Sequence, residues 1–167
     1  NAELFKSHFE QELARAARRN EMLALLHLDL DRFKTMNEAF GKEACNDVLR
    51  QVASRLRERV RETDMLARLE SDEFVVLQTG ITRPDDAAEL SRRLSEAFSL
   101  PFVSPQEDEE LHLSVSVGIT IAPTDGRTVD TLLKNADLAM YRAKAAGRDA
   151  YRFFAAEMNV AARRAVT

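Results

Sequence analysis

Acidic side chains lie where apolar segments of this sequence begin or end. Asp29 lies near the end of LALLHLDL, residues 23–30, while Asp72 and Glu73 directly precede the apolar run FVVL. If the two segments are neighbouring strands, three carboxylates meet at one edge of a sheet. Such hard oxygen ligands suit Mg²⁺, which binds through one or two carboxylates plus substrate phosphates. For any one acid alone, simple solvation at a strand end is the commoner explanation.

A possible anion site follows the first of these segments. The backbone amides from Asp31 to Lys34, including that of Phe33, open a predicted helix directly after the strand. The N-terminus of a helix attracts anions through its free amides and its dipole. A second basic group, Lys144 and Arg148, lies in KAAGR near the end of a later helix, where cations complement the helix dipole.

The elements that must position these residues alternate between helix and strand. Phe5, Phe9 and Leu13 recur every four residues and predict an amphipathic helix that ends near Arg19. The remaining helices are predicted from apolar residues at helical spacing, and Gly41 and Gly147 mark the ends of two of them. The remaining strands are predicted from apolar residues that alternate every two positions. The expected elements are a strand at 23–30, helices at 33–41 and 43–60, a hairpin of 65–69 with 73–78, a helix at 84–98, a strand at 111–122, a helix at 128–146 and a strand at 150–154.

This order predicts an α/β sandwich, in which helices cover a mixed central sheet that contains antiparallel hairpins. The chain of 167 residues, 45% hydrophobic, is long enough for one sizeable core, so a single domain is expected. The polar stretch 105–110, PQEDEE, is taken as a solvated connection without a function.

Composition excludes several broad classes of function. The net charge is −4, with both signs interspersed, which argues against general nucleic-acid binding. Cys45 is the only cysteine, so an internal disulfide is excluded and a reducing, cytoplasmic compartment is expected. No apolar run approaches the roughly 20 residues of a membrane span, and the N-terminus lacks the layout of a signal peptide. Membrane segments elsewhere in a longer parent protein stay open.

Four blocks of the sequence resemble one known family. LDLDRFKTMNEAFG, ARLESDEFVVL, SVSVGIT and NADLAMYRAKAAGR occur in the order and spacing of the GGDEF, or diguanylate cyclase, family, and together they cover nearly the whole chain. The resemblance implies a palm-like nucleotide-cyclase fold. In that family two GTP-loaded domains meet face to face and condense their substrates into cyclic di-GMP, which leaves a homodimer open for this chain.

The resemblance also implies roles for the acidic residues. Asp29 and Asp72 match the residues that hold the metal ions, with the carbonyl of Leu30 assisting. Glu73 matches a residue that binds metal or helps to activate the attacking 3′-hydroxyl. The chemistry implied is phosphoryl transfer, in which metal ions neutralise the triphosphate and align the nucleophile with the leaving group.

Three further positions match residues that contact the nucleotide in that family. Lys144 and Arg148 match its phosphate-contacting pair, and Asn37 matches the residue that hydrogen-bonds guanine. Taken alone, Asn37 is more simply a helix or turn residue that satisfies local backbone.

The signature itself is altered, because GGDEF reads ESDEF here. Glu70 and Ser71 replace two glycines and add a Cβ each at a turn expected to favour permissive dihedrals. Glu70 also places a negative charge where a triphosphate would lie, and like charges at close range cost free energy unless a cation intervenes. Catalytic geometry is expected to suffer.

A second departure affects the guanine site. The family commonly has glycine and aspartate where this chain has Cys45 and Asn46. The amide of Asn46 offers one acceptor oxygen beside an NH₂ donor, so it accepts the two guanine protons poorly. Asp47 lies one helical position further on, rotated by about 100°, and is a poor substitute.

Arg61 and Asp64 form an RxxD motif at the spacing at which active family members carry an inhibitory product site. Arginine can grip a phosphate or guanine edge with two hydrogen bonds, so the pair has a mechanism for binding cyclic di-GMP. The alternative is that RETD is only a helix end that runs into a loop.

The C-terminal stretch from Tyr151 resembles the segment that links GGDEF domains to a following EAL phosphodiesterase domain. We therefore expect a GGDEF domain at 1–156 and the start of a connecting helix at 157–167, in a piece of a composite protein. The expected function is a degenerate module that binds GTP or cyclic di-GMP, with Mg²⁺ if nucleotide is bound, and has weak or no cyclase activity. An active cyclase and a structural or dimerisation module that binds no nucleotide are the alternatives.

Overall fold

The computed structural model describes residues 2–104, 109–156 and 158, which form a mixed five-stranded sheet flanked by helices. The central strand β1 (Met22–Leu30) pairs antiparallel with both β3 (Glu73–Ile81) and β6 (Val115–Ala122). Strand β2 (Met65–Glu70) pairs antiparallel with β3 at one edge, and β7 (Tyr151–Phe153) pairs parallel with β6 at the other. The predicted mixed α/β fold is confirmed.

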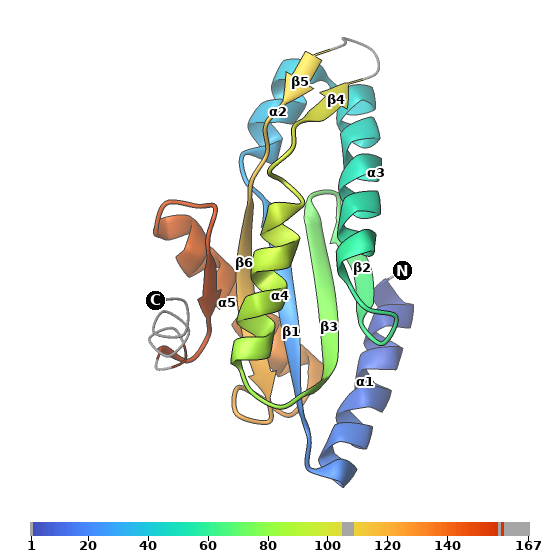
Figure 1. Cartoon of the computed structure of the whole chain (residues 1–167), viewed down its shortest axis with the longest axis vertical. Coiled ribbons are helices and arrows are strands. Elements are labelled where there is room, and N and C mark those ends of the chain that lie inside the picture. The colour runs from blue at the N-terminus through green and yellow to red at the C-terminus, as the bar shows by residue number, and fades with distance from the viewer. Residues whose placement is uncertain (1, 105–108, 157, 159–167) are drawn as a thin grey trace.

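Helices cover both faces of the sheet (Figure 1). Helices α3 (Lys42–Arg59) and α4 (Asp85–Glu96) lie on the near face in that view, and α2 (Phe33–Phe40) packs against α3. On the other face lie α1 (Ala2–Arg19) and α5 (Val129–Ala145), and α5 makes its closest approach to β6. The chain therefore has two apolar cores, one on each side of a shared sheet.

Strand β1 is apolar on both faces because both faces are covered, as its nearly continuous hydrophobic run predicts. Leu26 and Leu28 belong to the core under α3 and α4, whereas Leu23 and Leu25 belong to the core under α1 and α5. Side chains alternate between the faces of a strand, so residues 27 and 29 continue the second row. Both are polar, and the α5 side of the sheet thus changes from apolar to polar towards the end of β1.

Gly118 in β6 allows α5 to pack directly on the sheet. A Cβ at this position would lie 2.0 Å from the backbone oxygen of Ala136 and 2.3 Å from the backbone nitrogen of Met140. No larger residue fits without displacing the helix. The close approach brings the last turns of α5 over the polar end of β1.

The strand predicted at 111–122 is wrong in its first part. Residues Glu109–Leu111 form β5, which pairs with β4 (Phe102–Ser104) in a separate two-stranded sheet, and β6 begins only at Val115. The chain leaves the main sheet between them, where the Ser114 carbonyl accepts a hydrogen bond from the Asp31 amide. Most of the predicted connection 105–110 lies outside the described residues.

Arg55 of α3 holds the segment that follows α4. Its guanidinium donates to the carbonyl oxygens of Ala97, Leu100 and Pro101 at 3.0, 2.6 and 2.7 Å, and lies 3.8 Å from the centre of the Phe102 ring. Burial lowers the pKa of Arg55, yet guanidinium stays charged at any physiological pH. A planar fork with several donors suits this task better than a single ammonium does.

We expect Arg55→Ala to lower the free energy of unfolding by about 1–3 kcal/mol, because three carbonyl groups lose a charged donor. Arg55→Lys should recover only part of the loss. Urea unfolding followed by circular dichroism gives the values, with Arg57→Ala, an exposed arginine on the same helix, as the control. Equal stability of the Arg55 and Arg57 variants would contradict this assignment.

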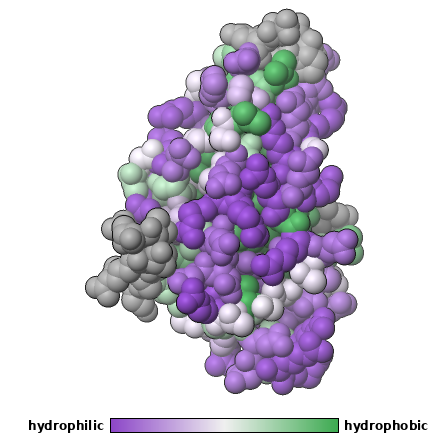
Figure 2. All heavy atoms as spheres, in the orientation of Figure 1, coloured by the Kyte–Doolittle hydropathy of each residue, from purple (hydrophilic) through white to green (hydrophobic). Residues whose placement is uncertain are grey.

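The predicted connecting helix, 157–167, lies outside the described residues apart from Met158, which packs against the larger core. The expected boundary after residue 156 therefore stays a prediction. Figure 2 shows that the face formed by α3 and α4 is mostly hydrophilic, with apolar atoms in small, scattered patches. Among the helices described, none combines the length and the apolar character that crossing a membrane requires.

Candidate nucleotide and metal site

The strand ends bring the predicted acidic residues together. Asp29 of β1 lies directly opposite Glu73 of β3 in the antiparallel register, and the amide of Leu30 donates to the carbonyl of Asp72 at 3.0 Å. The turn between β2 and β3 is therefore held against the end of β1. Asp29 and Glu73 both face α5, since each is in contact with residues on that side of the sheet.

Lys144 of α5 reaches into this group of acids. Its Nζ lies 2.9 Å from Oδ1 of Asp29, and the two side chains are 24% and 13% exposed. Burial raises the pKa of Asp29; the bond to Lys144 opposes that rise, and the charges of Asp72 and Glu73 add to it. Three carboxylates and one ammonium therefore share this end of the sheet. Mg²⁺ binds oxygen ligands, carboxylates above all, so the group of Asp29, Asp72 and Glu73 fits this ion.

Asp31 is a buried anchor whose role the sequence did not reveal. It is 3% exposed and accepts hydrogen bonds from the hydroxyls of Ser114 and Ser116, both at 2.6 Å, and from the amide of Asp149 at 3.0 Å. The last bond fixes the turn after α5, in which Arg148 and Asp149 have φ values of 66° and 46°. Asp31 therefore ties the turn that carries Arg148 to the end of β1.

The start of α2 differs in part from the expected anion site. The Asp31 amide is already bonded to the Ser114 carbonyl, so the prediction that it faces an anion is wrong. The helix starts at Phe33 after Arg32, whose φ of 57° is left-handed, and no side chain caps it. The amides of its first turn have no acceptor within the helix. Because the Phe33 ring is buried, only its backbone can face a phosphate, whereas Lys34 is exposed.

The predicted guanine-contacting residues lie on α2 and α3. Asn37 and Asn46 are both exposed, and the Asn37 carbonyl accepts from the amide of Gly41, where α2 ends as expected. Asp47 accepts a hydrogen bond from Arg50, one helical turn further along α3. This bond already engages the carboxylate of Asp47; that Asp47 cannot replace the missing aspartate stays a prediction.

The altered hairpin turn needs no glycine in this structure. Ser71 and Asp72 make the turn, and neither Glu70 nor Ser71 has a positive φ. The expectation that this turn favours permissive dihedrals is therefore wrong for residues 70 and 71. Pairing of β2 with β3 is irregular between Arg68 and Glu70, directly before this turn. The turn differs from one with two glycines in carrying two exposed side chains, those of Glu70 and Ser71, of which only Glu70 is charged.

The RxxD motif forms a compact turn between α3 and β2. The Asp64 carboxylate accepts from the Arg61 amide at 2.9 Å, and the Asp64 amide donates to the Arg61 carbonyl at 3.0 Å. Asp64 is half-buried, whereas Arg61 is exposed. Asp64 therefore stabilises the turn whatever else it does, while the guanidinium of Arg61 is placed at the surface.

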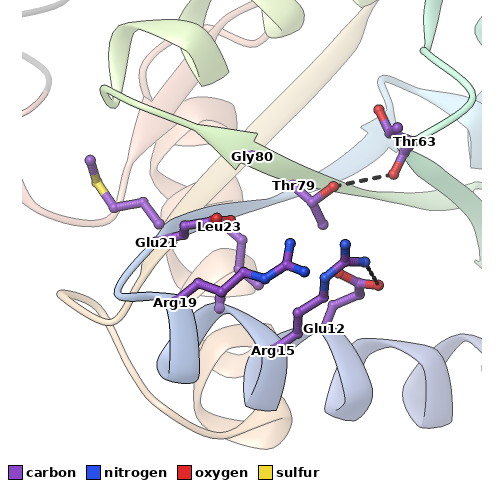
Figure 3. A pocket seen from close by; sticks show the side chains of 10 residues that line it. Glu12, Arg15, Arg19, Glu21, Leu23, Thr63, Thr79 and Gly80 are labelled. Atoms are coloured by element: carbon purple, nitrogen blue, oxygen red, sulfur yellow. Dashed lines mark hydrogen bonds and ion pairs between the residues drawn. The ribbon is translucent and has the colours of Figure 1, made fainter.

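A pocket beside this turn is lined by α1 and β3 (Figure 3). The guanidinium groups of Arg15 and Arg19 extend from α1 towards β3, and Glu12 lies 3.8 Å from the Arg15 guanidinium. Across the pocket, the Thr79 hydroxyl donates to the carbonyl of Thr63, within the RETD sequence, at 3.3 Å. Helix α1 and the residue that follows its turn thus place two arginines and two glutamates, Arg15, Arg19, Glu12 and Glu21, around this pocket.

Sequence reasoning missed two residues that join the acidic group. Nε2 of His27 lies 3.6 Å from a carboxylate oxygen of Glu73, and its Nδ1 lies 3.8 Å from a carboxylate oxygen of Asp137 on α5. Interaction with His27 is the main cause that lowers the pKa of Glu73, against the effect of burial. The signal for His27 was its place two residues before Asp29, on the same face of an otherwise apolar strand.

The fold and the site together define an α/β sandwich domain with a carboxylate group at the end of its central strands. Residues 1–150 match the family described as diguanylate cyclase, GGDEF domain, and the chain belongs to this family, which acts in cyclic di-GMP signalling. The resemblance drawn from the four sequence blocks is confirmed.

Similar proteins of known sequence are much longer than this chain. It is 41% identical, over 95% of its length, to the bifunctional diguanylate cyclase/cyclic di-GMP phosphodiesterase MucR of Pseudomonas aeruginosa, and spans 23% of that protein. It is 36% identical over 97% of its length to the cyclic di-GMP phosphodiesterase NbdA of the same organism, of which it spans 20%. The chain thus spans about a fifth to a quarter of these relatives.

A solved structure agrees with the fold. The GGDEF domain of PA1120 (TpbB or YfiN) from Pseudomonas aeruginosa superposes with a TM-score of 0.88 at 33% identity, covering 92% of this chain and 88% of that one.

Proposed function

We propose that this domain is a regulatory GGDEF module that binds GTP or cyclic di-GMP and has weak or no cyclase activity. One observation carries the proposal: the acids and Lys144 are assembled at the end of β1, while Glu70 and Ser71 occupy the adjoining turn. The acids and Lys144, which would bind a metal ion with a triphosphate, are present. The turn that would align the triphosphate for reaction is changed at Glu70 and Ser71.

Asp29, Asp72 and the carbonyl of Leu30 would hold Mg²⁺, and the ion would supply neutralisation of the triphosphate charge. Lys144 now neutralises Asp29 in part. With a cation on Asp29, the ammonium of Lys144 would be free to contact phosphate, together with Arg148 at the turn that Asp31 fixes. The amides of the first turn of α2 and the side chain of Lys34 would bind further phosphate oxygens.

The same arrangement accounts for poor turnover. Condensation requires the 3′-hydroxyl of one GTP to meet the α-phosphate of another in line, and Glu73 would assist that attack. Glu70 brings an additional negative charge to the turn that borders the triphosphate, which repels the substrate in the reactive position. Asn37 retains its guanine contact, whereas Asn46 accepts guanine protons poorly.

We further propose that a longer parent protein joins residues 1–156, through a connecting helix at 157–167, to an EAL phosphodiesterase domain. Similarity to the bifunctional MucR supports this arrangement. Since GTP is a cytoplasmic nucleotide, the domain is placed on the cytoplasmic side. Face-to-face pairing of two domains belongs to the cyclase mechanism, so the regulatory module does not require it.

We expect Mg²⁺ to raise the GTP affinity of the wild-type domain at least about tenfold, and to raise that of Asp29→Asn hardly at all. The substitution keeps the shape of the side chain but removes the charge that a hard cation needs. Without Mg²⁺ the variant should bind GTP no worse than wild type, because Lys144 has lost the partner that competes for it. Calorimetric titration with GTP, with and without Mg²⁺, measures both effects.

Asn37→Ala should weaken binding less than Asp29→Ala does, and Glu38→Gln, an exposed change on α2, serves as the control. Equal metal dependence in wild type and Asp29→Asn would remove Asp29 from the metal site. Failure of wild type to bind either nucleotide would favour the structural module, and ready formation of cyclic di-GMP would favour the active cyclase.

A further inference from the structure

Beside the predicted magnesium ligands, His27 lies between two carboxylates that come from different elements. It is on β1, Glu73 is on β3 and Asp137 is on α5, so the group forms only when the sheet and helix are packed together. Gly118 makes that packing close. The three residues are therefore held by the fold rather than by a mobile loop.

The buried imidazole has no hydrogen-bond partner among the described residues. His27 is 5% exposed, and neither Nδ1 nor Nε2 makes a hydrogen bond. A buried polar atom without a partner costs roughly 1–3 kcal/mol, and few are found in native structures. Both nitrogens instead face carboxylates, at 3.6 Å for Glu73 and 3.8 Å for Asp137, distances too long for hydrogen bonds. A single metal ion can bond to only one of the two ring nitrogens, so the carboxylate that faces the other nitrogen must move to reach that ion.

We propose that His27, Glu73 and Asp137 bind a divalent transition-metal ion, distinct from the magnesium that accompanies nucleotide. One ligand atom from each residue lies within 4.8 Å of the other two. Bonds of about 2.0–2.2 Å separate neighbouring ligand atoms by roughly 3–4 Å, so the group must contract by about 1 Å. The side chain of Asp137 is 60% exposed and free to make that movement.

The ligand set selects the class of metal. Imidazole favours zinc, cobalt and their neighbours, whereas magnesium prefers oxygen donors alone. Asp29 differs in this respect, because its neighbours are carboxylates and the ammonium of Lys144. Glu73 is common to the two groups, so a metal on His27 draws this carboxylate away from a nucleotide. The site would thus let a transition metal oppose nucleotide binding.

The competing explanation is a protonated imidazole that pairs with both carboxylates. An imidazolium ring has two N–H donors, and each faces an acid here. That arrangement satisfies the charges without any metal and predicts no metal binding by this group. Titration with a spectroscopically active ion separates the two explanations.

The test is a Co²⁺ titration of the intact chain without nucleotide or Mg²⁺, followed by visible absorption and calorimetry. We expect saturable binding of one ion with ligand-field bands, and at least a tenfold loss of affinity in His27→Leu and in Asp137→Asn. Because no nucleotide is present, failure of the proposed GTP site cannot affect the result. Excess Zn²⁺ should displace Co²⁺ and remove the bands.

His112→Gln is the matched control, because His112 is an exposed histidine remote from this group in the sequence. It should bind Co²⁺ as wild type does. If His27→Leu does not fold, as judged by circular dichroism, the surface change Asp137→Asn decides the matter. Absence of saturable binding in wild type, unchanged binding in Asp137→Asn, or loss of binding in His112→Gln would each overturn the proposal.

Discussion

The purified domain is expected to make cyclic di-GMP from GTP and Mg²⁺ at less than about one hundredth of the rate of an intact family member. A hundredfold deficit corresponds to roughly 2.7 kcal/mol of lost transition-state stabilisation. We expect Glu70 to account for most of it, because its negative charge lies at the turn where the substrate triphosphate is proposed to bind. Chromatography of the products after long incubation gives the rate, and a rate close to that of the intact enzyme would contradict the assignment.

Stepwise substitution separates the causes of this deficit. Since neither Glu70 nor Ser71 has a positive φ, the loss of glycine flexibility should matter less than the charge of Glu70. Glu70→Ala, which keeps a Cβ, is therefore expected to recover a large share of what Glu70→Gly with Ser71→Gly recovers. The further change Asn46→Asp should add activity by restoring the acceptors for guanine. Glu62→Ala, at an exposed acid before the hairpin, should change nothing.

If Glu70→Ala recovers no activity while the double glycine variant does, bulk rather than charge is the obstacle at the turn. If even the triple variant is inactive, the deficit lies outside these three positions.

The strands and helices were predictable where local pattern and burial agree. β1 reads as a continuous apolar run because both its faces are covered, and the hairpin of β2 and β3 shows in the change to a two-residue period. The convergence of Asp29 with Glu73 followed from the assumption that their strands are neighbours. Pairing of those strands in antiparallel register makes the two residues opposite each other.

What could not be predicted depends on contacts between distant parts of the chain. The strand expected at 111–122 is interrupted because Glu109–Leu111 pairs with Phe102–Ser104 in a separate sheet, while Ser114 binds Asp31, 83 residues earlier in the chain. Periodicity reports which face a side chain takes, and it carries no information on such a partner. The approach of His27 to Asp137 likewise requires α5 to pack closely on the sheet at Gly118.

The turn at Glu70 and Ser71 shows a different limit. Glycine at these positions in the family suggested that the turn favours unusual dihedrals, yet neither Glu70 nor Ser71 has a positive φ. A missing glycine predicts strain only when the backbone keeps the conformation that needed it. We therefore expect the loss of cyclase activity to come from the side chains of Glu70 and Ser71 and not from a strained backbone.

At the RxxD turn, an effect of a substitution on cyclic di-GMP binding can be distinguished from an effect on folding stability. Arg61→Ala is expected to weaken cyclic di-GMP binding by roughly ten- to a hundredfold, because it removes a charge-assisted contact of about 1.5–3 kcal/mol. The turn should survive, since it depends on the backbone amide and carbonyl of Arg61 and not on its side chain. Calorimetric titration with cyclic di-GMP measures the loss, and thermal unfolding confirms that stability is unchanged.

Asp64 requires a gentler substitution than alanine, because its carboxylate also accepts the Arg61 amide. Asp64→Asn keeps an acceptor for that amide and removes the charge, so weaker binding with unchanged stability would assign the carboxylate to the ligand. Asp64→Ala should lower both binding and stability. GTP binding should be nearly unaffected in every variant, because sites without shared contacts behave almost independently. If cyclic di-GMP binds wild type and Arg61→Ala equally, or binds neither, RETD is only the turn that follows α3, and any sensing by this domain depends on GTP alone.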